Sequence, residues 1–89
     1  MTDIQSPMNL TGAQIRAGRA LVKWSAADLA SASGLGIATI NRAEKDDGKP
    51  LKLTVANQAA IIGAFGRAGV ILVAENGEGP GVRLKKSLS

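Results

Sequence analysis

The sequence predicts a mainly α-helical domain of four or five helices, followed by a C-terminal β-hairpin. Capping-box spacings that begin at Thr11 and Ser25 mark two helix starts. A turn containing Gly34 separates two short helical segments, and after Gly69 the helical period gives way to a β-branched run. A chain of 89 residues has room for one small core and no second one.

The first helix is expected over about residues 12–23, after a flexible tail of residues 1–10 that shows no hydrophobic period. Thr11 supplies the capping hydroxyl for this helix, and a glutamine follows three residues later. Ser25 repeats the arrangement with an aspartate three residues later, which also suits the positive end of the helix dipole. A second helix is therefore expected over about residues 26–33.

A third helix is expected over about residues 36–45, because Gly34 stands where a helix end needs a left-handed residue and helix formers then resume. A polar turn that contains proline ends this helix. Thr54 is the N-cap of a fourth helix, which Gly69 closes. Residues 11–68 are thus expected to form one helical domain.

Residues 69–89 are expected to form a β-hairpin and a tail, with a long glycine-rich loop before the alternating run 82–85. A lone hairpin is marginally stable in water, and fifteen alanines and eleven glycines give the core little apolar area. We therefore expect a homodimer in which a second chain covers the first strand. The residues expected at that interface are Val70, Ile71, Leu72 and Val73.

The composition disfavours several classes of protein. The chain has no cysteine and no histidine, so a Cys/His metal site is ruled out, and neither a nucleophile–base pair nor a cofactor site is expected. No apolar run approaches the roughly 20 residues of a membrane span, and the N-terminus lacks the layout of a signal peptide. We expect a cytoplasmic protein that is not an enzyme and that needs no metal or membrane.

Two short helices joined by a glycine-containing turn have the layout of a helix-turn-helix. Residues 24–44 resemble the phage-repressor and Cro-like family, often called Xre-like, and the likeness extends over about residues 11–68. The resemblance implies a repressor-like domain of four or five helices that binds operator DNA as a dimer, and a salt bridge between Arg19 and Glu44. Residues 69–84 resemble the C-terminal hairpin of some small bacterial Xre-like regulators, which implies a sheet shared by two chains.

We therefore expect a regulator of transcription that binds double-stranded DNA at a palindromic operator, as a dimeric repressor with the third helix in the major groove. The residues expected to face the bases are Gly36, Ile37, Ala38, Asn41 and Arg42. The residues expected to approach the DNA backbone are Arg16, Lys23, Thr39 and Lys45. For Thr39 a hydrogen bond to a carbonyl one turn earlier is the alternative.

A second hypothesis is a protein-interaction module on the same fold, such as an antitoxin or antiactivator that occludes a protein partner. It rests on Ala26, Ile37 and Ala38, which stand where the family often has polar residues. With apolar residues at these places, direct hydrogen bonding to bases is limited to Asn41 and Arg42.

Overall fold

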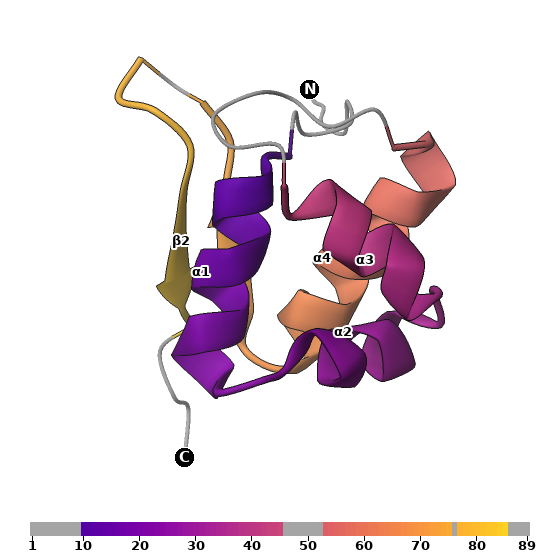
Figure 1. The fold of residues 1–89 in the computed structure, drawn as a ribbon. Coiled ribbons are helices and arrows are strands. Elements are labelled where there is room, and N and C mark those ends of the chain that lie inside the picture. The colour runs from indigo at the N-terminus through magenta and orange to yellow at the C-terminus, as the bar shows by residue number, and fades with distance from the viewer. Residues whose placement is uncertain (1–9, 46–52, 76, 86–89) are drawn as a thin grey trace.

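The computed structural model describes residues 10–45, 53–75 and 77–85, which form four helices and one antiparallel hairpin (Figure 1). The described part of the chain is therefore mainly helical, as predicted, and a fifth helix is not among its elements. In chain order the elements are α1 (Gly12–Val22), α2 (Ala26–Ser33), α3 (Ile37–Ala43), α4 (Val55–Arg67), β1 (Val70–Val73) and β2 (Gly81–Leu84).

Helix α1 begins with the predicted capping box. The Gln14 amide donates to the Thr11 hydroxyl over 3.1 Å, and the Thr11 amide donates to the Gln14 side-chain oxygen over 3.0 Å. The side-chain nitrogen of Gln14 also donates to the carbonyls of Val73 and Gly81, each over 3.0 Å. Because Val73 and Gly81 are paired across the hairpin, Gln14 joins the start of α1 to the end of the strand ladder nearest the loop.

The prediction of a flexible tail over residues 1–10 is wrong for the last of these residues, because Leu10 is fully buried in the core. Leu10 directly precedes the N-cap, and Ile15, also fully buried, occupies the fourth helical position. These are the two positions of a hydrophobic staple, which sets the direction in which the chain enters a helix. Residues 1–9 lie outside the described residues.

Helix α2 has local hydrogen bonds at both ends. The Ser25 amide donates to the Asp28 carboxylate over 2.8 Å, and the Asp28 amide donates to the Ser25 hydroxyl over 3.0 Å. At the other end Gly34 adopts a φ of 77°, a left-handed conformation that glycine takes without a steric penalty, and its amide donates to the Ala30 carbonyl.

Helix α3 is shorter than predicted, since it covers seven residues and ends at Ala43. Its N-cap is Gly36, which makes no side-chain capping hydrogen bond. Glu44 is the C-cap, and its amide donates to the Ile40 carbonyl four residues earlier. The Lys45 amide donates to the Arg42 carbonyl three residues earlier, as in a tightened last turn. Lys45 lies in the turn that follows.

Helix α4 lies across the core from α1. Phe65 of α4 is fully buried, and its ring stacks on Trp24 with the centroids 5.8 Å apart. A Cβ atom added to Gly18 of α1 would come within 2.9 Å of the Phe65 ring. The absence of a side chain at Gly18 therefore lets α1 and Phe65 approach closely.

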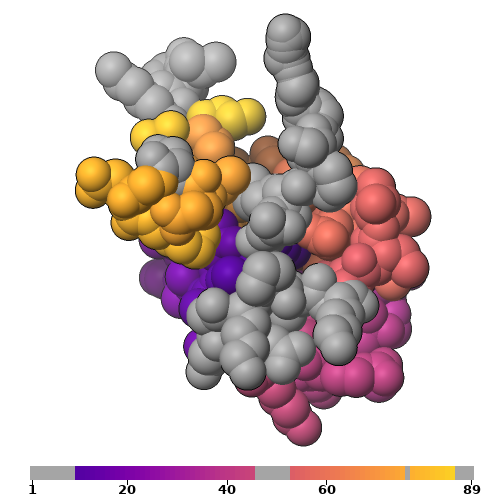
Figure 2. All heavy atoms as spheres, turned by 90° about the horizontal axis from the view of Figure 1, so that it is seen from above, coloured from indigo at the N-terminus to yellow at the C-terminus, as the bar shows by residue number. Residues whose placement is uncertain are grey.

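The hairpin pairs β1 with β2 in antiparallel register, with Val70 opposite Leu84 and Val73 opposite Gly81. Val70 and Leu72 are buried against the helices, whereas the alternate residues Ile71 and Val73 are half-buried. Both views place the hairpin at one side of the molecule and α3 at the other (Figures 1 and 2). None of the described helices is long and apolar enough to cross a membrane.

Candidate nucleic-acid interface

The structure brings the five residues expected to face bases onto one exposed surface, which we call the outer face of α3. Residues 37, 38, 41 and 42 fall within about 140° of the helix circumference because successive residues are about 100° apart. Gly36 precedes them as the N-cap. All members of the outer face are exposed: Gly36, Ile37, Ala38, Asn41 and Arg42.

The opposite side of α3 is buried in the core. Ile40 is fully buried and Ala43 is 5% exposed. Leu29 of α2, also fully buried, belongs to the same core cluster. This division between a buried and an exposed side anchors α3 and leaves its polar groups on the outside.

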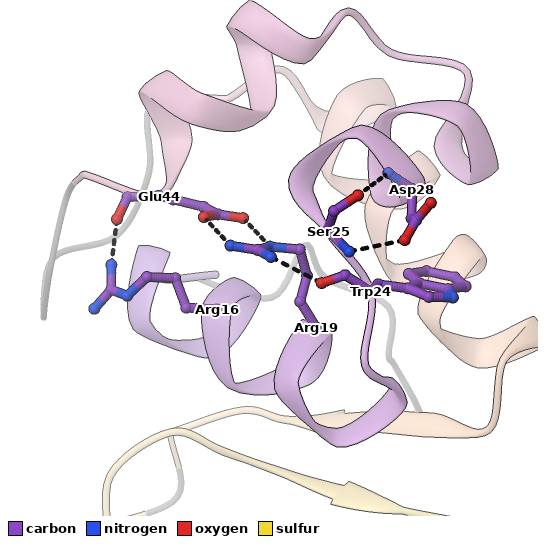
Figure 3. A network of polar contacts seen from close by, with 6 residues as sticks. All are labelled: Arg16, Arg19, Trp24, Ser25, Asp28 and Glu44. Atoms are coloured by element: carbon purple, nitrogen blue, oxygen red, sulfur yellow. Dashed lines mark hydrogen bonds and ion pairs between the residues drawn. The ribbon is translucent and has the colours of Figure 1, made fainter.

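The C-terminal end of α3 is joined to α1 by an ion pair (Figure 3). The Arg19 guanidinium donates to the two carboxylate oxygens of Glu44 over 2.6 and 2.8 Å, the bidentate geometry that makes such pairs strong. A third hydrogen bond runs from Arg19 to the Trp24 carbonyl over 2.8 Å. The ion pair implied by the family resemblance is therefore present, and Arg19 connects α1, the start of α2 and the end of α3.

The hydrogen bond with Glu44 raises the pKa of Arg19 above its usual value, although partial burial of the guanidinium opposes that shift. The side chains are 21% exposed for Arg19 and 10% for Glu44, so the guanidinium is partly buried and the carboxylate is more deeply buried. A guanidinium is protonated at neutral pH in any case, and the pairing with Glu44 favours that charged form.

Two further features of α1 contact the end of α3. The Arg16 guanidinium donates to the main-chain carbonyl of Glu44 (Figure 3). A Cβ atom added to Gly12 would lie 2.7 Å from the Ala43 oxygen and 2.8 Å from the Glu44 oxygen. Contact of Arg16 with a phosphate stays a prediction, and the structure gives this residue a partner inside the chain.

The other residues expected at the DNA backbone occupy different places. Lys45 is exposed just after α3, and Thr39 is half-buried on α3 with no hydrogen bond from its hydroxyl to another described residue. Lys23 is exposed at the C-cap of α1, where it has a φ of 57°. Lys45 and Thr39 therefore lie in or next to α3, whereas Lys23 belongs to the end of α1.

The residues expected at a dimer interface divide into two pairs. Val70 and Leu72 are 2% and 7% exposed within the single chain, so they contribute to its own core. Ile71 and Val73 lie on the other side of the strand, with Arg83 opposite Ile71. Of the four residues expected at a dimer interface, Ile71 and Val73 are therefore the two that a second chain can still cover.

Sequence reasoning missed the tertiary roles of three residues in α1 and just before it. Leu10 was available as an apolar residue directly before an N-cap, which is the staple signal. The close approach of Gly12 to α3 and the bonds from Gln14 to the hairpin have no local signal, because their partners lie about 30 and 60 residues further along the chain.

The side chains on the outer face of α3 can form hydrogen bonds and apolar contacts with a partner. It presents one guanidinium, one carboxamide and the apolar side chain of Ile37, on a chain with a formal net charge of +4. Within the described residues there is no cluster of three or more acidic groups that could hold a metal ion.

The chain matches no protein-family model and no curated protein sequence with significance.

Proposed function

We propose that this protein is a regulator of transcription that binds double-stranded DNA, with α2 and α3 as a repressor-like helix-turn-helix and α3 in the major groove. The observation that carries the proposal is the outer face of α3. It exposes hydrogen-bonding groups of Asn41 and Arg42, while the buried side and the Arg19–Glu44 ion pair hold the helix in place.

The connection between α2 and α3 supports this proposal. Gly34 has the left-handed conformation of a tight turn, and only Leu35 and Gly36 separate it from α3. Leu29 and Ile40, one from each helix, are both fully buried, as expected where two short helices pack across a turn. A major groove about 12 Å wide accepts one α-helix, and its base edges offer partners to amide and guanidinium groups.

The proposed regulator acts as a homodimer through the hairpin. Ile71 and Val73 are apolar and half-buried on the side of β1 opposite to the buried Val70 and Leu72. Sedimentation of the full chain at micromolar concentration is expected to give a dimer, and Ile71→Glu is expected to give a folded monomer. A wild-type monomer under these conditions would remove the dimer from the proposal.

Selection of binding sites from random duplexes tests DNA binding directly. The full chain is expected to enrich a palindrome whose half-sites lie about 34 Å apart, one turn of B-DNA. Binding to that site is expected to weaken steeply with salt because counterions are released from the phosphates. Failure to enrich any sequence would reject sequence-specific binding.

Arg42→Ala then tests the outer face of α3 on the selected duplex. We expect an affinity loss of about tenfold or more, as for loss of a specific base contact. Lys85→Ala is the matched control, since it removes one positive charge from an exposed residue directly after β2. Strand β2 lies on the opposite side of the molecule from α3 (Figure 1). Equal losses in the two variants would exclude Arg42 from base contact and leave only general electrostatic attraction.

A second candidate function is occlusion of a protein partner, as an antitoxin or antiactivator would do. Ile37, which is 49% exposed, favours it together with the adjacent exposed Ala38, because contiguous apolar surface often marks protein contacts. Capture of partners from the source cell, with and without nuclease, separates the two functions. Partners that all disappear after nuclease support DNA binding, whereas a stable protein partner supports occlusion.

A further inference from the structure

The outer face of α3 is divided along its length into an apolar and a polar half. Ile37 and Ala38 lie in the first turn, and Asn41 and Arg42 lie one turn later. Ile37 is the first residue of the helix and is 49% exposed, whereas Ile40, the other large apolar residue of α3, is fully buried. The core therefore encloses Ile40, whereas about half of Ile37 is left for contact with a partner.

The surroundings of Ile37 leave it accessible. Beside it, a Cβ added to the preceding residue, Gly36, would meet no atom within 4 Å apart from its chain neighbours, so Gly36 itself borders open space. Ala38 follows with a short side chain and is exposed too. An approaching surface can thus contact the Ile37 side chain without displacing any described residue.

The major groove offers one apolar group on its base edges, the methyl group at C5 of thymine. Arg42 and Asn41 on the same face favour a polyanion that also carries hydrogen-bonding groups, which suits DNA better than an apolar protein surface. In the proposed orientation the N-terminal part of α3 is the part nearest the bases. Ile37 then meets a base edge, where burial of a methyl group is the contact that it can make.

We infer that Ile37 determines part of the sequence specificity by contacting the C5 methyl group of a pyrimidine, which in unmodified DNA is thymine. The inference rests on the proposed function and names the base that the proposed site recognises. Burial of one methyl group corresponds to about a fourfold gain in affinity. The preference is expected at one base pair of each half-site.

The test uses the selected duplex with one methyl group removed at a time. Each thymine is replaced in turn by uracil, which lacks only the methyl group, and affinity is measured for the full-length wild-type protein. We expect one replacement per half-site to lower affinity by about fourfold. At that position a cytosine and a 5-methylcytosine are then compared, which distinguishes thymine recognition from recognition of the methyl group alone.

Three variants assign the effect to Ile37. Ile37→Ala is expected to bind the thymine and uracil duplexes equally, and Ile37→Val to keep a preference because it retains a branched apolar side chain. Val55→Ala is the matched control, since Val55 is the first residue of α4 and is 64% exposed. This control is expected to keep the full preference for thymine.

The outcomes separate the inference from the function on which it rests. If the selected duplex is bound and no uracil replacement lowers the affinity, the methyl contact is wrong and DNA binding stands. The same conclusion follows if uracil lowers the affinity of Ile37→Ala as much as that of the wild type. If 5-methylcytosine restores the affinity that cytosine lacks, the methyl group itself is the recognised feature. If no duplex is bound specifically, the inference and the proposed function both fail.

Discussion

Helices α2 and α3 are neighbours of similar length, yet they are held in different ways. Helix α2 has a capping box between Ser25 and Asp28 and a left-handed glycine at its end, all within the helix and its caps. Helix α3 has no side-chain cap, and the contacts at its C-terminal end come from α1. The capping bonds of α2 therefore come from its own sequence, and Arg67 of α4 adds one hydrogen bond to the Ala32 carbonyl, whereas the end of α3 is held by side chains of α1 more than 20 positions away.

The largest expected effect comes from breaking the connection between α1 and α3. Glu44→Ala is expected to lower the free energy of unfolding by about 3 kcal/mol, because it removes two charge-assisted hydrogen bonds from the partly buried Arg19 guanidinium. Urea unfolding measures the loss. A double-mutant cycle with Arg19→Ala supplies the control, since a coupling energy near zero would contradict the role given to the ion pair.

A smaller loss is expected where α1 approaches α3 most closely. Gly12→Ala is expected to cost about 2 kcal/mol, because the added Cβ would lie 2.7 Å from a main-chain oxygen at the end of α3 and one helix must shift. Gly66→Ala in α4 is the matched control. Its Cβ meets open space, so we expect a gain of about 0.5 kcal/mol from the higher helix propensity of alanine. Thermal unfolding that ranks the two variants equally would refute the close approach.

The next effect concerns α2 and its own cap. Ser25→Ala is expected to lower the free energy of unfolding by about 1 kcal/mol, because the Asp28 amide loses its hydroxyl partner. DNA affinity per folded molecule is expected to change little, since the outer face of α3 is untouched. An unchanged unfolding midpoint in urea would show that the cap contributes nothing.

The smallest expected effect adds to α3 the cap that it lacks. Gly36→Ser is expected to raise stability by about 0.3 kcal/mol, because Gly36 already has extended N-cap dihedrals and open space at Cβ. Gly36→Ala has a methyl group and no hydroxyl, so it serves as the control and is expected to gain nothing from capping. If both variants change the unfolding midpoint equally, a cap at this position has no value.

Much of the helical architecture was predictable because helix starts are local. The caps at Thr11, Ser25 and Thr54 were each expected, and each hydroxyl accepts from the amide three residues later. The hairpin was also expected, and β2 begins and ends one residue earlier than the alternating run 82–85. The exposed residues of α3 followed from the helical period once the neighbouring turn at Gly34 was recognised.

The end of α3 shows where such reasoning stops. The sequence from Ile37 to Lys45 contains good helix formers and predicts a longer helix. In the structure the Glu44 carbonyl accepts a hydrogen bond from Arg16, and the Glu44 side chain binds Arg19. Glu44, the residue directly after Ala43, is thus engaged with α1, and the local preference for helix yields to those contacts.

The sequence by itself determined the order of the elements and the caps of α1, α2 and α4, because each cap is a hydrogen bond between residues three apart. The tertiary structure decided that Val70 and Leu72 enter the core while Ile71 and Val73 do not, since a strand apolar on both sides has no preferred inner face of its own. It also decided that Gln14 binds the hairpin, a contact whose partners lie 59 and 67 residues further along the chain. Such contacts depend on packing in three dimensions, which no local pattern specifies.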